Sequence, residues 1–467
     1  MINIILAIDK NYGIGKNGKL PWYIKEELQI FKNKTIDSIV IVGRKTLEKL
    51  PILKDRTIFC ITKSITVLCE NKIVTFFTSV DEAIITAKRM NKKIFIIGGN
   101  QLYNYVFKNY KKELYVHISY LNDIYDCDTY FNDNNLNNFY IKSEIKYEKF
   151  NHVEMVYCRY GEQQYLDLLK DILENGECRK TRNSETISDF CKHLKFDLRD
   201  GFPLLTTKKM FLKGIIEELL FFIRGETDSK ILEEKGVNIW KGNTNREFLD
   251  DNGFNDRSEG EMGPMYGYQW RYFGMNYDEK EKPQKITDDF NILSIFFGGD
   301  IKSKYRGLDQ LKNVINEIKT NPSSRRILLT SYNPLQADEG VLFPCHSVIT
   351  QFYVSMDGFL DMFCYNRSND NFHGTPFNIA STSLLLMIIA QITKLTPRYV
   401  NISQGDSHIY ASHIDSVKEQ LTRIPYTFPE LLLPPFETLE EVEKLSFTDF
   451  KLSNYKSYPT IKVDMVP

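Results

Sequence analysis

The chain has no excess of charge, no paired cysteines and no long hydrophobic run. Its formal net charge of −1 gives it no overall attraction to nucleic acid or to an anionic membrane. Its eight cysteines include no CxxC pair, which argues against a zinc site and a disulfide framework and fits a reducing, cytoplasmic setting. The start, MINIILAIDKNYG, is apolar over too few residues for a secretory signal. We therefore expect no membrane segment, no need for nucleic acid and no metal.

The longest apolar run, LLLMIIA, is far shorter than a membrane span and suits a buried helix. Hydrophobic residues make up 42% of the 467 residues and charged residues 26%, a balance that allows sizeable cores. The length suggests roughly two to four domains.

Short β-branched strands alternate with helix-like stretches in the first third of the chain. The strands are NIILAI, SIVIVG, RTIFCIT, KIFIIGG and ELYVHIS, and the helices include IKEELQIFKN and VDEAIITAKRM. This alternation predicts an α/β domain, with helices flanking a mixed, mostly parallel sheet, over residues 1–160.

The pattern of apolar residues changes at YLDLLKDILENG, where helical spacing ends on a glycine. Long helices (FLKGIIEELLFFIRG, STSLLLMIIAQI) then mix with strands (RRILLTSYN, TQFYVSM, FLDMFCY). This pattern predicts an α+β domain over residues 161–467. No Pro/Gly/Ser-rich linker separates the two parts.

Cys345 stands in LFPCHSVITQFYV, directly before an apolar run. A lone cysteine in such a place is most often a core residue. Arginines in isolated polar contexts favour a second interpretation, because arginine grips phosphate well and a nearby guanidinium favours the reactive thiolate. The residues concerned are Arg182, Arg325, Arg326 and Arg367. Cys345 is therefore either a buried core thiol or a nucleophile beside a phosphate site.

From about Gln163 to the C-terminus the chain resembles thymidylate synthase. The resemblance rests on FPLLTTKK, EELLFFIRG, IWKGN, GPMYGYQWRYFG, SSRRILLTSYNP, PCH, QFYV, RSND, PFNIAS, GDSHIY and YPTIK. It implies conversion of dUMP and 5,10-methylenetetrahydrofolate to dTMP and dihydrofolate. It also implies a homodimer formed through this domain, with Arg325 and Arg326 reaching across the interface.

The resemblance assigns roles that suit the chemistry. A thiolate that adds to C6 of uracil makes C5 nucleophilic, and Cys345 matches that residue. Glu218 would organise proton transfer, Tyr266 would assist removal of the C5 proton, and Asn378 would recognise uracil rather than cytosine. The implied dUMP ligands are Arg182, Arg325, Arg326, Arg367, Ser368, Asp370, Asn378, His408 and Tyr410. The implied folate contacts are Lys208, Trp240 and Asp370.

This part also departs from the family. The phosphate loop is NSETIS, shorter than usual and without glycine, which predicts altered closure over the nucleotide. One extra residue lies between His346 and Gln351, and we interpret it as a β-bulge. Other departures are His373 for leucine, Asn366 for glutamine, Lys241 for an acidic residue, and the final MVP.

Residues 1 to about 160 resemble dihydrofolate reductase through GIGKNGKLPW, YIKEELQIF, VGRKT, IIGGNQLY and YDCDTYF. The resemblance implies reduction of dihydrofolate to tetrahydrofolate with NADPH. Glu27, in an otherwise apolar helix segment, would accept the adjacent N–H groups of the pterin, the alternative being an exposed helical glutamate. The implied folate contacts are Ile5, Ala7, Glu27, Leu28, Phe31, Arg56 and Ile97.

The turns GRKT and GGNQ place backbone N–H groups where a pyrophosphate can bind. Positive charge on Arg44, Lys45 and Lys63 favours NADPH over NADH. The full implied cofactor set is Ala7, Ile14, Gly43, Arg44, Lys45, Thr46, Thr62, Lys63, Ser64, Gly98, Gly99, Asn100, Gln101 and Leu102. Leu47 and Asn100 replace a usual tryptophan and glycine. His117 stands near the place of a threonine that bonds the catalytic carboxylate, and is either a core histidine or the sign of a register slip.

Together the two resemblances predict one chain with two consecutive activities, in which the reductase consumes the dihydrofolate that the synthase makes. One alternative is a pyrimidine hydroxymethylase on the same fold, in which water replaces the hydride; Asn378 argues against its cytosine version. The other alternative is a degenerate reductase kept as a structural or RNA-binding module. Retention of Glu27, Arg56 and both glycine turns argues against it.

Overall fold

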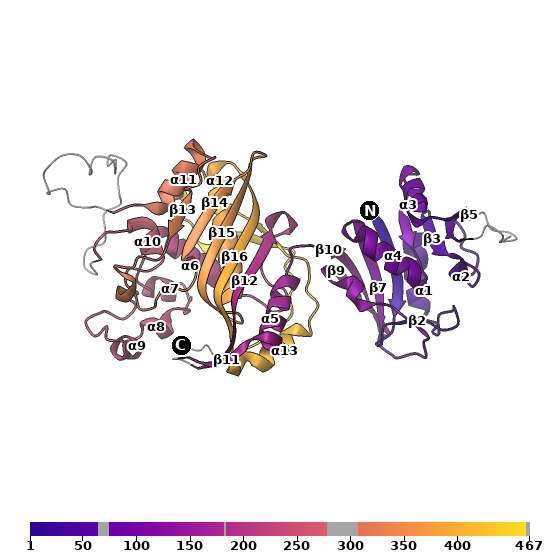
Figure 1. The fold of residues 1–467 in the computed structure, drawn as a ribbon, viewed down its shortest axis with the longest axis horizontal. Coiled ribbons are helices and arrows are strands. Elements are labelled where there is room, and N and C mark those ends of the chain that lie inside the picture. Colours follow the sequence, from indigo (N-terminus) through magenta and orange to yellow (C-terminus); the bar gives the residue numbers. More distant parts are fainter. Residues whose placement is uncertain (64–73, 182–183, 278–306, 464–467) are drawn as a thin grey trace. The chain divides into compact units, whose positions relative to one another are not determined.

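The computed structural model describes residues 1–63, 74–181, 184–277 and 307–463 (Figure 1). The chain divides into two compact units, Met1–Arg159 and Tyr160–Pro467. The sequence analysis placed this boundary one residue later.

An eight-stranded sheet forms the centre of the first unit, in the order β5-β4-β3-β6-β1-β7-β10-β9. All neighbouring pairs are parallel except β7–β10 and β10–β9. The predicted mixed, mostly parallel sheet is therefore confirmed. The strands are β1 (Ile2–Ile8), β3 (Ile39–Gly43), β4 (Thr57–Ile61), β5 (Val74–Phe77), β6 (Ile94–Ile96), β7 (Leu114–Leu121), β9 (Phe139–Lys146) and β10 (Phe150–Tyr157).

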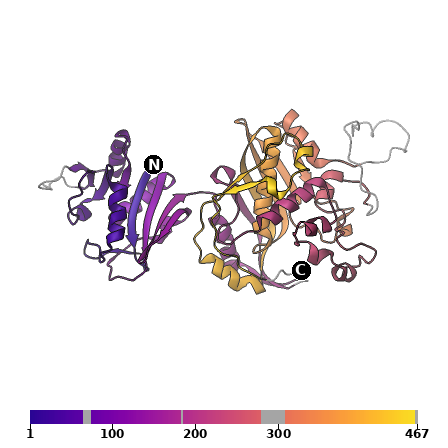
Figure 2. The same cartoon turned by 180° about the vertical axis from the view of Figure 1, so that it is seen from behind.

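Helices flank this sheet (Figures 1 and 2). They are α1 (Lys25–Thr35), α2 (Arg44–Leu47), α3 (Val80–Arg89) and α4 (Asn100–Tyr110), and a small pair of strands, β2 (Gly13–Gly15) and β8 (Thr129–Tyr130), lies apart. Helix α1 has Glu26 and Glu27 in its first turn and Lys32 and Lys34 in its last, a charge order that complements the helix dipole. Phe31 of α1 packs on the core cluster that contains Ile5, so α1 covers one face of β1.

A six-stranded sheet forms the centre of the second unit, in the order β11-β12-β16-β15-β14-β13. Only β15–β16 is parallel. The strands are β11 (Glu177–Lys180), β12 (Glu185–Asp197), β13 (Leu328–Thr330), β14 (Ile349–Val354), β15 (Phe359–Asp370) and β16 (Thr396–Tyr410). A separate pair consists of β17 (Glu430–Leu432) and β18 (Lys451–Ser453).

Long helices accompany this sheet, as the α+β prediction requires. The helices are α5 (Gln163–Asn175), α6 (Leu212–Arg224), α7 (Lys230–Glu234), α8 (Lys241–Thr244), α9 (Arg246–Asp251), α10 (Gly267–Tyr272), α11 (Gln310–Thr320), α12 (Gly374–Thr393), α13 (Ile414–Leu421) and α14 (Leu439–Val442). Among the described residues, α12 alone is long and apolar enough to cross a membrane, with a mean hydropathy of 1.4, but 72% of its apolar window is buried inside the protein. The apolar run LLLMIIA thus lies in a core helix, as predicted.

Candidate active sites

Cys345 lies just before β14, beside a tyrosine hydroxyl. The Tyr266 hydroxyl is 3.3 Å from the Cys345 sulfur and accepts a hydrogen bond from the Cys345 backbone N–H at 3.2 Å. The Tyr266 ring stacks on His346 with centroids 4.4 Å apart. Burial, with the neighbouring sulfur, raises the pKa of Tyr266 well above its usual value. Cys345 is only partly buried, so part of its surface is open to solvent.

Arg367 is tied to the segment that leads into Cys345. Its backbone N–H donates to the Cys345 carbonyl at 2.8 Å, while its guanidinium donates to the carbonyls of Pro344 (3.2 Å) and Phe343 (3.4 Å). These bonds hold a permanent positive charge close to the thiol. The Ser368 N–H donates to the same Cys345 carbonyl at 3.3 Å.

Glu218 lies on α6 in the wall of the same region. The indole N–H of Trp240 donates to its Oε1 at 2.8 Å. Burial raises the pKa of Glu218 to about 7, although the Trp240 hydrogen bond opposes that shift. A carboxyl group that titrates near neutrality can both accept and release protons under working conditions.

The parallel pairing of β15 and β16 brings the remaining nucleotide residues together. Ser368 is in register with Asp406, and Asp370 with His408. His408 shares a hydrogen bond of 2.7 Å with Asp406, and its ring centroid is 5.1 Å from that of Tyr410. Residues that are about 40 positions apart in the chain thus meet on two neighbouring strands in the middle of the sheet.

Asp370 and Lys208 converge on the start of α12, the helix that carries the half-buried Asn378. The Asp370 carboxylate accepts from the N–H groups of Phe372 (2.8 Å) and His373 (3.2 Å). The Lys208 ammonium donates to the Phe372 carbonyl and lies 3.7 Å from the centroid of that ring. Burial lowers the pKa of Lys208 to about 7.

Two predicted arginines are not in this cluster, and the position of a third is not described. Arg182 lies outside the described residues. Arg325 and Arg326 are exposed in the turn before β13, and neither guanidinium makes a hydrogen bond or ion pair with the described residues of its own chain. Lys180 of β11 is in register with Glu185 of β12, and residues 185–188 of the expected NSETIS loop belong to β12.

The extra residue before Gln351 produces a local irregularity at the start of β14. Ile349 is in register with Tyr365, yet the N–H of the preceding Val348 also bonds to the Tyr365 carbonyl, at 2.9 Å. Two residues thus oppose one, as in a β-bulge. Ser347 has a positive φ of 50°, and its N–H donates to Asn366 at 2.9 Å. Asn366 therefore supports the bulge that follows Cys345.

The other departures lie around the site. His373 packs its ring against Phe372 and His413, with centroids 5.4 and 5.0 Å away. The Lys241 ammonium is 4.0 Å from a Glu233 carboxylate oxygen. The final MVP lies outside the described residues.

In the first unit, Glu27 is buried, with 5% of its surface exposed, while the adjacent Glu26 is exposed. Burial raises the pKa of Glu27 to about 7. The Tyr103 hydroxyl donates to the Ile5 carbonyl at 2.9 Å. Burial and the charge of Glu27 both raise its pKa. The structure therefore favours a pocket carboxylate over an exposed helical glutamate.

Most of the expected folate-lining residues lie on α1 and β1, and Ile97 directly follows β6. Ile5, Ala7 and Ile97 are buried, and Leu28 and Phe31 are partly buried. Arg56 is fixed at the C-terminal end of α1. Its guanidinium donates to the Thr35 hydroxyl (2.9 Å) and the Lys32 carbonyl (3.0 Å), and also to the carbonyl of Lys54 (2.6 Å).

The two glycine turns meet at the ends of β3 and β6. The Gly43 N–H donates to the Gly98 carbonyl at 2.8 Å. A Cβ on Gly99 would lie 3.0 Å from the Thr46 hydroxyl oxygen, so a side chain there would crowd the cradle. Helix α4 begins at Asn100 directly after Gly99, and its first N–H groups are free for a phosphate. The turns therefore fit a dinucleotide pyrophosphate.

The remaining cofactor candidates lie around this cradle. Arg44 pairs with Glu48 at 2.6 Å, and the Asn100 amide donates to the Tyr130 carbonyl at 2.8 Å. Lys45, Lys63 and Gln101 are exposed, Ile14 and Thr46 are partly buried, and Thr62 and Leu102 are buried. Leu47 belongs to the core cluster of the unit. Ser64 lies outside the described residues.

His117 does not contact Glu27. It is in register with Ile5, but its ring faces Asn3 and Glu154, at 3.4 and 3.5 Å. Ser119, two residues further along β7, is in register with Ala7, and its hydroxyl lies 3.1 Å from His152 Nδ1. Ser119 was not among the residues expected from the sequence, although side chains two residues apart on a strand share a face.

The comparisons with known proteins agree with this geometry. Residues 163–467 match the family model of thymidylate synthase, and residues 1–162 match that of dihydrofolate reductase. The chain is 36% identical to a bifunctional dihydrofolate reductase-thymidylate synthase of Paramecium tetraurelia over 483 residues, which cover 99% of this chain and 98% of that protein. It is 34% identical to bifunctional dihydrofolate reductase-thymidylate synthase 2 of Arabidopsis thaliana (99% and 87% covered) and 33% identical to the Leishmania major protein (99% and 94% covered). The chain therefore belongs to the bifunctional dihydrofolate reductase–thymidylate synthase family, and its two units carry these two activities in that order.

Proposed function

We propose that Cys345 is the nucleophile of the synthase reaction, with dUMP and 5,10-methylenetetrahydrofolate as its substrates. The observation that carries this proposal is the 3.3 Å contact between the Cys345 sulfur and the Tyr266 hydroxyl, beside the guanidinium of Arg367. The thiolate adds to C6 of uracil, and the electron pair moves to C5, which attacks the methylene carbon of the folate. Tyr266 assists departure of the C5 proton, and Glu218 passes protons near neutral pH. Loss of the C5 proton breaks the bond between the methylene carbon and N5 of the folate. Hydride from the released tetrahydrofolate then reduces the methylene group to methyl, which leaves dihydrofolate, and the sulfur leaves C6.

The nucleotide is held by charge and by matched hydrogen bonds. Arg367 and Arg182, with Arg325 and Arg326 of a second copy, neutralise the phosphate. The Asn378 amide both accepts and donates, which suits N3–H and O4 of uracil. His408 and Tyr410 lie together to bind the sugar hydroxyl. Ser368 supplies a further hydroxyl, and Trp240, Asp370 and Lys208 contact the folate.

A second copy of the chain is the partner that the outer sheet face fits. Leu328, Ile349, Tyr353 and Phe363 lie on one face of β13, β14 and β15, and Tyr353 is 62% exposed. An apolar sheet face of this kind is typical of an interface. The exposed Arg325 and Arg326 lie at the edge of this face, which supports their action in trans across a homodimer.

Glu27 serves the reductase reaction by binding and protonating. Its carboxyl group accepts the adjacent N–H groups of the pterin, and its raised pKa keeps a proton available for N5 near neutral pH. Ser119, in register with Ala7, helps to position the substrate. Arg56 binds the α-carboxylate of the folate. NADPH, when bound, supplies the hydride, and the glycine turns with Arg44, Lys45 and Lys63 would hold its phosphates.

Neither reaction written in this way needs a metal. Every cysteine in the described residues is a free thiol, which supports a cytoplasmic location.

The test is a two-stage absorbance assay on the purified full chain. Addition of dUMP and 5,10-methylenetetrahydrofolate should raise the near-ultraviolet absorbance as dihydrofolate forms, and NADPH should then lower it. Cys345→Ala should abolish the rise in absorbance but leave the reduction of added dihydrofolate intact. Glu27→Gln should keep the rise in absorbance and abolish the reduction of dihydrofolate. A hydroxymethylated nucleotide in the product mass spectrum would instead support the hydroxymethylase. A rise in absorbance that NADPH does not reverse would support a reductase unit kept only as a structural module.

A further inference from the structure

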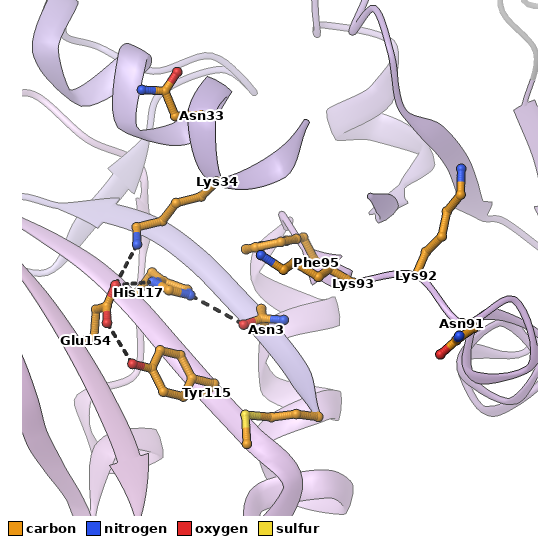
Figure 3. Close-up of a pocket in the computed structure, with 11 residues that line it drawn as sticks. Asn3, Asn33, Lys34, Asn91, Lys92, Lys93, Phe95, Tyr115, His117 and Glu154 are labelled. Atoms are coloured by element: carbon orange, nitrogen blue, oxygen red, sulfur yellow. Dashed lines mark hydrogen bonds and ion pairs between the residues drawn. The ribbon is translucent and has the colours of Figure 1, made fainter. Parts of the chain in front are cut away.

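A polar cluster in the first unit contains three residues that neither proposed reaction uses. His117 of β7 and Glu154 of β10 are direct cross-strand partners, and His152 lies two residues before Glu154. The pocket beside His117 and Glu154 has a volume of about 690 Å³. Figure 3 shows these two side chains with Lys34, Tyr115 and Asn3 at one end of the pocket. None of the three central residues has a role in the proposed reactions.

Each member of the cluster has one atom available for a ligand. The His117 Nδ1 and His152 Nε2 atoms are buried without a hydrogen-bond partner in the described part of the chain. The two side chains belong to residues that are only 5% and 3% exposed. One ligand atom from each of His117, His152 and Glu154 lies within 4.8 Å of the others, and His117 Nδ1 is 3.5 Å from Glu154 Oε1. Two unpartnered ring nitrogens and a carboxylate oxygen thus lie within one small region.

The opposite side of each side chain is already held. His117 Nε2 is 3.4 Å from the Asn3 amide oxygen, and His152 Nδ1 is 3.1 Å from the Ser119 hydroxyl. Metal-binding histidines are usually oriented in this way, with the second ring nitrogen donating to an oxygen. Glu154 Oε2 accepts from the hydroxyls of Tyr115 (2.6 Å) and Ser143 (3.0 Å), which leaves Oε1 facing the histidines.

A cation occupies this region even without a metal. The Lys34 ammonium is 2.5 Å from Glu154 Oε1 and comes from the last turn of α1 (Figure 3). Its side chain is 28% exposed, so it can turn outward to solvent. A carboxylate oxygen and two imidazole lone pairs repel an anion, and the cluster therefore selects positive charge.

We propose that His117, His152 and Glu154 form a binding site for a divalent transition-metal ion, Zn²⁺ first among them, and that the ion displaces the Lys34 ammonium. Two imidazoles and one carboxylate are a ligand set that zinc accepts, with water in the fourth position. Bonds of about 2.0–2.2 Å require the three ligand atoms to close by roughly one ångström, which side-chain rotation supplies. Cysteine spacing, on which the expectation of no metal rested, does not bear on a site without cysteine.

The first experiment measures Zn²⁺ affinity on the chelator-treated full chain by competition with a chromophoric zinc indicator. Glu154→Gln should weaken binding by at least about tenfold, whereas His193→Ala, which removes an exposed imidazole from the second unit, should leave the affinity unchanged. Lys34→Met should have the opposite effect and tighten binding, because the competing ammonium is gone. Lys34→Met also keeps the proposal testable if Glu154→Gln does not fold, which circular dichroism would report.

Substitution with Co²⁺ identifies the ligands. A tetrahedral site of two imidazoles and a carboxylate gives visible d–d bands without the near-ultraviolet band of a thiolate–cobalt bond. A thiolate band would place the ion at a cysteine and overturn the proposal. An affinity that neither Glu154→Gln nor Lys34→Met alters would also overturn it.

Discussion

The indole N–H of Trp240 donates to Glu218 Oε1 at 2.8 Å, and this bond opposes the rise in the pKa of Glu218 that burial causes. The bond joins α6 to the residue that precedes α8. The proposed proton-transfer group of the synthase therefore depends on a neighbour from a different element.

Trp240→Phe should move the acidic limb of the synthase pH–rate profile upward from about pH 7. Removal of a hydrogen bond to the ionised carboxylate raises its pKa further, by about one unit at the usual strength of such bonds. Activity lost at pH 7 should therefore return at higher pH. Trp270→Phe is the control, because that indole donates to Ser331 instead. An unmoved limb in Trp240→Phe would remove Glu218 from the proton path.

Tyr266→Phe should lower the kcat of thymidylate formation by about 10²-fold, the usual contribution of a positioned proton-transfer group. The change removes only the hydroxyl that touches the Cys345 sulfur and N–H. Tyr268→Phe, on the same helix, removes a hydroxyl that bonds to the Asn276 carbonyl, and should keep its kcat. Steady-state kinetics that show equal effects of the two changes would contradict the assignment.

Dihydrofolate reduction should slow tenfold per pH unit above about pH 7, because the Glu27 carboxyl, whose pKa burial raises to about 7, must be protonated. Glu27→Gln should remove this limb and lower kcat by about 10²–10⁴-fold. Glu26→Gln, at the exposed neighbouring position, is the matched control. Stopped-flow rates across pH 5 to 9 would reveal the limb, and its persistence in Glu27→Gln would mean that another group titrates.

The same carboxyl group should make the first unit less stable as the pH rises. The folded pKa of Glu27 (about 7) exceeds the ordinary value of 4.5, so the folded state binds more protons than the unfolded state between these values. The contribution to stability is therefore complete below about pH 4.5 and is lost as the pH rises through about 7, by about 3 kcal/mol. Urea unfolding of Glu27→Gln should lack this loss. Parallel pH dependences in the variant and the wild type would contradict the prediction.

Cys345→Ala and Arg326→Ala should each inactivate the synthase, yet their mixture should recover roughly a quarter of wild-type activity. Random reassortment of a two-fold symmetric dimer gives half heterodimers, each with one intact site. Mixing Cys345→Ala with Tyr266→Phe is the control, because both changes lie in one site of the same chain. If synthase activity did not recover after reassortment, Arg326 would act within its own chain.

Prediction from the sequence succeeded where a motif is local. The alternation of strands and helices predicted the mixed sheet, and GRKT and GGNQ predicted two turns that the structure brings together at Gly43 and Gly98. It fell short where strand register decides neighbours. His117 was expected to be either a core histidine or the sign of a register slip, and the structure buries it beside Asn3 and Glu154, with Ser119 in register with Ala7. A register relation joins residues that are far apart in the chain, so spacing does not reveal it.

The sequence by itself determined the order of the two activities, the chemical nature of Cys345 and Glu27, and the apolar character of α12. These depend on residue type and short-range pattern. Only the tertiary structure decided that Tyr266 touches Cys345, that Trp240 bonds Glu218, and that His117, His152 and Glu154 share one polar cluster. Their partners come from separate elements, and the pKa values of the buried carboxyl groups depend on how completely those elements exclude water.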